Sequence, residues 1–253
     1  MIRTLFIATI IISLITSCLP AGAAIMKTNP RVNFNVPIAQ QTKVIKKSSL
    51  SNGNITSTCF NYGWFAIIET NDPGLMGSAA ITIRYRSKQM NSSSICHKNF
   101  KGKTLSLTDY DGYFWGVKGN YLFIAAADSF GAERKFQVFE LTNGKLIYHD
   151  IKNDNENFTI TQHKQQLTLY YFKGLNVSCN LAQDTSECWK KTLIDNNIPA
   201  SLKLMMPDCR ESFINAHSPL DNKAQVSTLV KVANLAMPTI EYLGGKTTCH
   251  PRP

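Results

Sequence analysis

Residues 113–150 read YFWGVKGNYLFIAAADSFGAERKFQVFELTNGKLIYHD, and the fold class follows from this stretch. Its apolar runs have the length of β-strands and are rich in aromatic and β-branched residues. Short turn-forming segments separate the runs at 118–120 and 142–145. The second segment contains Asn143-Gly144, which is the strongest short-range signal for a β-hairpin. The stretch therefore predicts an antiparallel meander of four strands.

The flanking sequence continues the β pattern. Ile81 and Ile83 alternate with polar residues over 80–86, which is the period of a strand with one solvated face. The apolar runs at 158–161 and 167–172 predict a further hairpin. We expect a mainly β fold in which an antiparallel meander forms a sandwich or a barrel-like sheet.

A small propeller-like arrangement is the alternative fold. Stretches that begin at Trp64, Tyr121 and Leu167 each run from an apolar strand through a polar loop to a second strand. Their spacing is close to the length of a propeller blade. Closing a propeller takes roughly four or more blades, so these units are too few. The sandwich or barrel-like sheet is therefore the first expectation.

The pattern changes near the C-terminus, and a subdomain from about residue 192 is one interpretation of the change. Short helices are expected at 192–198 and at 208–216, where Asp208 is placed to cap the helix. The apolar residues over 226–235 have helical spacing, although the valines there would also suit a strand. A disulfide is expected to hold this segment in place.

Cysteine usage indicates an exported, disulfide-bonded protein. The chain has seven cysteines, and Cys18 lies within an N-terminal export signal, which leaves six. An even number behind such a signal is typical of a disulfide framework. No C-x-x-C motif is present, so the cysteines are interpreted as structural rather than as redox or zinc-binding residues. Sequence neighbours favour the pairs Cys59–Cys96, Cys179–Cys188 and Cys209–Cys249.

The first residues have the pattern of an export signal. Arg3 precedes an apolar run over 5–15, which has the length of a signal-peptide core and is too short to span a membrane. Cleavage by ordinary signal peptidase would remove residues 1–23 as the signal peptide. A lipoprotein-like sequence instead ends the signal at residues 1–17 and leaves a lipidated Cys18. We expect a periplasmic or outer-membrane-anchored protein, with release into the medium as the alternative.

Positive charge is concentrated ahead of the β pattern. The chain has 27 basic and 17 acidic residues, for a net charge of +10, and residues 1–50 hold six of the bases and no acid. We interpret 24–55 as a basic polar tether with one short edge strand at 42–45, and 56–253 as the β-rich domain. Such a tether is either a solvated linker or a contact to anionic lipids or cell-wall polymers. The domain is only weakly basic, so nucleic acid is not an expected partner.

No sequence motif indicates catalysis. The five histidines form neither an H-E-x-x-H motif nor another metal-ligand spacing, and no G-x-S-x-G elbow is present. No catalytic residue, metal ligand or cofactor is therefore predicted.

Aromatic residues crowd the stretch 110–130, and aromatic side chains on loops anchor protein partners in many complexes. Where such residues alternate along a strand, they would instead fill the core. The predicted partner-binding residues are Tyr113, Trp115, Phe130 and Arg134.

An export signal, a β-rich domain and clustered aromatics without a catalytic motif favour a non-catalytic binding protein of the bacterial cell envelope. Such a protein would hold a protein partner in the periplasm. Within this class, an inhibitor or immunity protein acting on a toxin or hydrolase fits the size of the chain. Two alternatives stay open: a structural lipoprotein of the cell wall or envelope, and a secreted hydrolase with dispersed catalytic residues.

Overall fold

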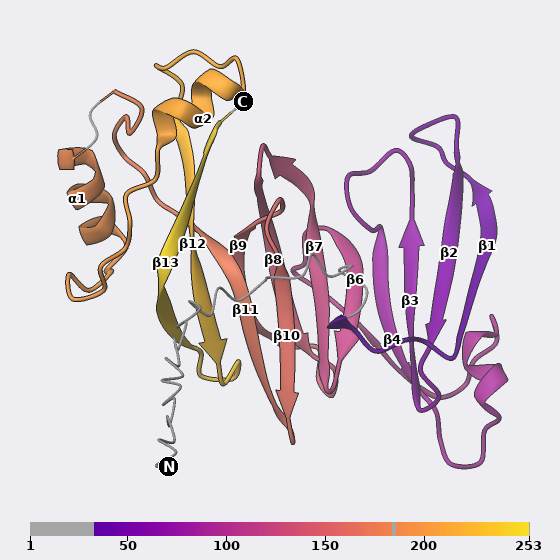
Figure 1. Ribbon diagram of the computed structural model, residues 1–253. Helices are drawn as coiled ribbons and strands as arrows, with labels where there is room; N and C mark the ends of the chain where they lie inside the picture. Colours follow the sequence, from indigo (N-terminus) through magenta and orange to yellow (C-terminus); the bar gives the residue numbers. More distant parts are fainter. Residues whose placement is uncertain (1–32, 184–185, 253) are drawn as a thin grey trace, which may run out of the picture.

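The computed structural model describes residues 33–183 and 186–252, and Figure 1 shows that this part of the chain is mainly β. Its antiparallel strands form two sheets, neither of which closes into a barrel within the described residues. Two α-helices lie at the end of the molecule away from the first sheet (Figure 1). The predicted fold class, a mainly β antiparallel meander with a disulfide-linked C-terminal segment, is confirmed.

The first sheet holds five strands in chain order, each antiparallel to the next. The strands are β1 (Ala39–Lys47), β2 (Asn54–Asn61), β3 (Phe65–Asn71), β4 (Ala80–Tyr85) and β5 (Lys103–Ser106). β1 and β5 form its two edges. A 3₁₀ helix, η2 (Ser92–Cys96), lies between β4 and β5 in the chain.

The second sheet has the order β13-β12-β11-β9-β8-β7-β6, and β10 pairs with β11. The predicted meander at 113–150 forms its β6 to β9, and the predicted hairpin at 158–161 and 167–172 forms β10 and β11. The strands are β6 (Tyr113–Lys118), β7 (Tyr121–Phe130), β8 (Glu133–Glu140), β9 (Leu146–Asn153), β10 (Phe158–His163), β11 (Gln166–Leu175), β12 (Ala224–Ala233) and β13 (Thr239–Pro251).

The internal similarity in the sequence has a structural basis. The repeated stretches begin with β3, β7 and β11. Each of these strands is the second of four consecutive strands in the chain. The second and third sets of four do not form separate blades, because β9 pairs with β11 at Lys173↔Lys152 and joins them into one sheet.

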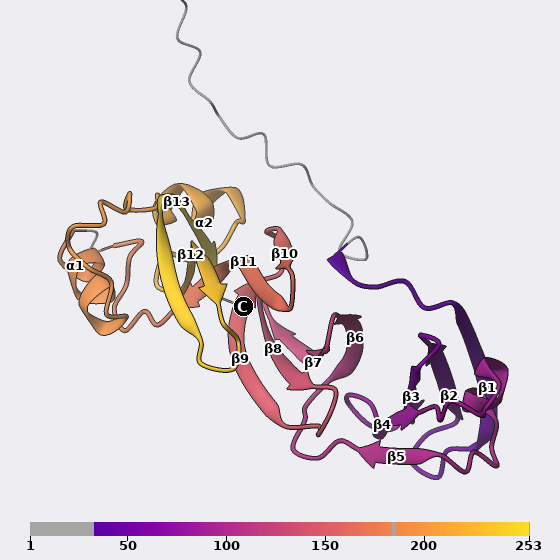
Figure 2. The same cartoon turned by 90° about the horizontal axis from the view of Figure 1, so that it is seen from below.

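An aliphatic core joins the two sheets as a sandwich. Ile67, Ile81 and Ile83 of the first sheet are fully buried and cluster with Leu122 and Ile124 of the second sheet. Burial of each such side chain contributes about 2 kcal/mol. Figure 2 shows the first sheet beside β6 to β9, on the side of the molecule away from the helices. Because successive side chains of a strand point to opposite faces, the opposite face of the first sheet is turned away from this core.

Phe34 joins the N-terminal segment to a second, mainly aromatic core. The segment 33–38 lies within the range expected to be a polar tether, yet Phe34 is only 8% exposed. Its ring makes edge-on contacts with Trp115 at 5.3 Å and with Phe123 at 5.2 Å between centroids. Gly116 makes room for it, since a Cβ there would lie 2.3 Å from the Phe34 ring. This distant glycine allows a largely exposed segment to bury an aromatic ring.

Hydrogen bonds fix the same segment to the second sheet. The Asn33 side chain donates to the Phe158 carbonyl at 2.6 Å and accepts from the Ile160 backbone N–H at 3.2 Å. The Asn35 backbone N–H donates to the Val117 carbonyl at 2.7 Å. The chain then crosses to the first sheet, where it enters β1. The edge strand expected at 42–45 is therefore part of a longer strand that is anchored at its start.

The C-terminal segment packs its helices, α1 (Ser186–Asp195) and α2 (Cys209–Asn215), against β12 and β13. α2 matches the predicted helix, and Asp208 caps it by accepting from the Glu211 backbone N–H at 2.8 Å. α1 lies earlier than the predicted 192–198, and the chain leaves it through Asn197, whose φ of 53° is left-handed.

The segment 226–235, whose apolar spacing is helical, forms most of β12. Both neighbouring strands, β11 and β13, pair with it and satisfy its backbone. The valines that also suit a strand therefore decide its structure. The disulfide Cys209–Cys249 ties α2 to β13, and Cys179–Cys188 closes the loop ahead of α1, as sequence neighbours favour.

Replacing Phe34 by alanine should lower the free energy of unfolding by about 3–5 kcal/mol, because it empties a buried aromatic site. Val36→Ala is the matched control, since Val36 is 82% exposed and its loss should cost less than about 0.5 kcal/mol. Urea denaturation of both variants measures the difference. Equal stabilities would show that the N-terminal segment does not contribute to the core.

Candidate functional site

The four predicted partner-binding residues occupy different environments. Tyr113 on β6 is 42% exposed. Trp115, on the same strand, packs into the aromatic core, with its ring 4.7 Å from that of Phe158. Arg134 on β8 forms an ion pair with Asp154, with 2.7 Å between Nε and Oδ2. Their role in partner binding stays a prediction.

Other predicted features fall outside the described part of the chain. The Phe130 backbone belongs to β7, but its side chain is not among the described atoms. The export signal and Cys18 precede residue 33 and also lie outside. Across 33–183 and 186–252, no helix has both the length and the apolar character needed to cross a membrane. No group of three or more His, Cys, Asp or Glu side chains in those ranges is placed to hold a metal ion.

A buried polar network centred on Asp150 belongs to the fold. Its carboxylate accepts from Tyr148 at 2.8 Å and from Tyr171, and forms an ion pair with Lys173. Burial raises the pKa of both tyrosines, and the Asp150 carboxylate raises it further, so the hydroxyls stay neutral donors. The network spans β9 and β11, where backbone pairing is limited to Lys173↔Lys152. We therefore assign it to stabilising that junction.

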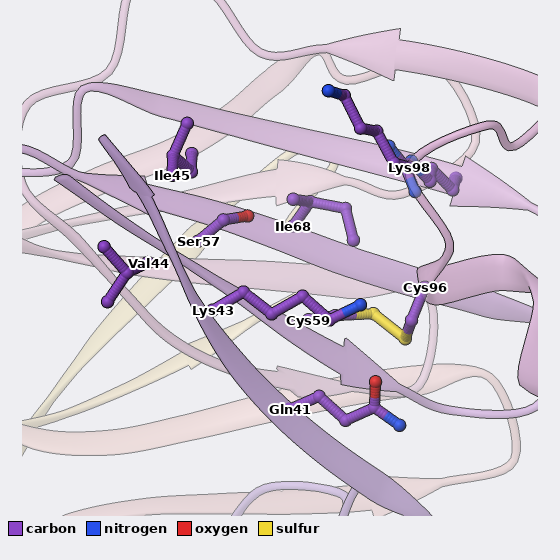
Figure 3. A pocket seen from close by; sticks show the side chains of 10 residues that line it. Gln41, Lys43, Val44, Ile45, Ser57, Cys59, Ile68, Cys96 and Lys98 are labelled. Carbon is purple, nitrogen blue, oxygen red and sulfur yellow. A yellow bond between two sulfur atoms is a disulfide. The ribbon is translucent and has the colours of Figure 1, made fainter.

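A pocket of about 320 Å³ lies on the face of the first sheet that points away from the sandwich core. Ser57 and Cys59 of β2 and Ile68 of β3 line it together with the β1 side chains Gln41 and Lys43 (Figure 3). We refer to this site as the β1 pocket. The strand register explains the arrangement, because Gln41, Cys59 and Ile68 are neighbours across three strands, and Lys43 is opposite Ser57.

The disulfide Cys59–Cys96 closes one side of the β1 pocket and fastens the loop 91–100, which contains η2. Ile95 beside it is fully buried against Cys59 and Ala66. Arg84 of β4 holds the same loop, since its Nη1 donates to the Ile95 carbonyl at 3.0 Å and to the His97 carbonyl at 2.8 Å. The wall of the pocket is thus fixed by a covalent bond, by apolar packing and by charge-assisted hydrogen bonds.

The β1 pocket is basic. Lys43, Arg84 and Lys98 line it, and none of its lining residues is acidic. Burial lowers the pKa of Arg84, but a guanidinium titrates so far above neutrality that it remains charged. Ile45 and Ile68 supply apolar surface between the charges. This combination suits an anionic group attached to an extended or apolar scaffold.

Little in the sequence predicts the β1 pocket. Its lining comes from four strands and one loop, with no local motif. The available signal is the start of β1, where Gln41 and Lys43 lie on one face of a strand that carries bases and no acid; Ile45 lies at the register shift between Val44 and Lys46. Trp64 was not among the predicted binding residues, although its side chain is exposed. It is 61% exposed, and the Arg86 guanidinium lies 4.4 Å from its ring centroid.

Comparison of the chain with protein-family models, with curated proteins and with solved structures gives no match.

Removing the disulfide at the pocket with Cys59→Ala/Cys96→Ala should lower the free energy of unfolding by about 4 kcal/mol, because it releases a crosslink spanning 37 residues. Amide hydrogen exchange should rise across 91–100, where the loop is fastened. Cys179→Ala/Cys188→Ala is the matched control and should leave exchange at 91–100 unchanged. Unaltered exchange in the first variant would mean that Arg84 and Ile95 hold the loop without the disulfide.

Proposed function

We propose that this protein is an exported binding protein of the bacterial cell envelope, which holds a protein partner with an acidic contact surface. The β1 pocket is the site that we propose for the partner. Within this class, a periplasmic inhibitor or immunity protein acting on a toxin or hydrolase is the more specific proposal.

The observation that carries the proposal is the charge of the β1 pocket. Three basic side chains line a hollow that contains no acid and has apolar surface between the charges. Lys46 and Lys47 extend the positive surface along β1. Complementary charge accelerates encounter and selects the partner, while buried apolar area supplies affinity. An acidic protein segment satisfies both requirements.

Three disulfides support the exported part of the proposal, because such bonds persist in oxidising compartments such as the periplasm. One of them builds the wall of the β1 pocket, so the proposed site would be complete only in such a compartment. The predicted signal at 1–23, or at 1–17 with lipidation of Cys18, is consistent with the same location.

The β1 pocket should account for partner capture. Lys43→Glu/Lys98→Glu reverses two exposed charges that line it and should lower retention of the partner at least tenfold, because attraction becomes repulsion. Full-length tagged protein is isolated from the envelope fraction of cells that naturally produce it. Each co-purifying protein is identified and quantified, and its affinity for the purified variants is measured.

The matched control is Lys135→Glu/Lys145→Glu, which reverses two exposed charges on β8 and in the turn after it. This variant should retain the partner as the unaltered protein does. A partner retained equally by all three proteins would place binding outside the β1 pocket. Recovery of no stoichiometric protein would contradict the proposed function itself.

A further inference from the structure

The edge strand β1 borders the β1 pocket and has an open side. It pairs with β2 along one side, and no other strand within 33–183 or 186–252 pairs with its second side. All nine residues of β1 are exposed. An edge of this kind presents unpaired N–H and C=O groups to solvent, and an extended peptide can add to it as a further strand.

The position of β1 relative to the pocket makes this edge different from the other edge of the first sheet. Gln41, Lys43, Val44 and Ile45 of β1 line the pocket, with a register shift of β1 between Val44 and Lys46. Alternate side chains of an added strand would lie beside Gln41 and Lys43. The opposite edge strand, β5, has four residues and contributes none to the pocket. β1 therefore combines backbone pairing with a site for side chains.

Charge decides which kind of strand fits. β1 carries Lys43, Lys46 and Lys47 and no acidic residue. A second copy of this chain that paired antiparallel over the whole of β1 would place Lys43 opposite Lys43, which is unfavourable for like charges on adjacent strands. Edge lysines are a common protection against such self-association. An acidic strand, in contrast, would place carboxylates next to the β1 lysines and Lys98.

We propose that β1 binds an extended, acidic segment of a partner protein by strand addition, with alternate side chains of that segment over the β1 pocket. This inference rests on the proposed function and specifies its binding mode and the chemistry of the partner. Backbone hydrogen bonds then hold the segment, and its carboxylates select it.

The test uses the purified mature protein and a synthetic nonapeptide that alternates threonine and glutamate, with blocked ends. A lysine-for-glutamate peptide is the charge control. Two further peptides carry backbone N-methyl groups, on the glutamates alone or on the threonines alone. An added strand turns alternate N–H groups toward its neighbour, so one N-methylated peptide should lose binding at least tenfold while the other stays within about threefold. The lysine peptide should not bind.

Amide hydrogen exchange in the presence of the acidic peptide should slow in 39–47 and stay unchanged in β5 and β13. Equal binding of both N-methylated peptides, or no slowing in 39–47, would overturn strand addition while leaving the pocket as a site for an acidic surface. Absence of any binding by the acidic peptide would also overturn it. A dimer that forms through β1 without peptide would show that a second copy is the occupant. The proposed function is judged separately, by capture of the natural partner with the Lys43→Glu/Lys98→Glu variant.

Discussion

Burial of Ile67, Ile81 and Ile83 against the second sheet determines which face of the first sheet meets solvent. Side chains alternate along a strand, so this one apolar contact places the basic and polar residues of β2 to β4 on the opposite face. A shift of register by one residue would bury those charges and expose the isoleucines. The β1 pocket therefore depends on the sandwich core, although it shares no residue with it.

Two local anchors complete that face. Phe34 enters the aromatic core of the second sheet and leads the chain toward β1, so the edge strand starts from a fixed point. On the other side, the disulfide Cys59–Cys96 and the hydrogen bonds of Arg84 hold the loop that contains η2. Both anchors join segments that are far apart in the chain. The pocket is therefore a product of tertiary structure rather than of a motif.

The strands and turns were predictable because their signals are local, as the Asn143-Gly144 turn between β8 and β9 illustrates. The burial of Phe34 was not, because it requires the absent side chain of Gly116 on another strand. Simple alternation along β6 would place Tyr113 and Trp115 on one face, but the pairing of β6 with β7 shifts register between Phe114 and Gly116, and Trp115 lies in the aromatic core while Tyr113 is exposed. The pocket could not be foreseen, because its charges converge only after the strands have paired.

The central claim is that a partner binds at β1 beside its pocket. Site-specific photocrosslinking in cells that produce the protein tests it most directly, with the crosslinker placed at Gln41 of β1, at Thr104 of β5 or at Tyr113 of β6. All three positions carry exposed side chains. The account predicts one dominant protein adduct from Gln41 and none from Thr104. An adduct from Tyr113 with none from Gln41 would contradict the account and place the partner on the second sheet.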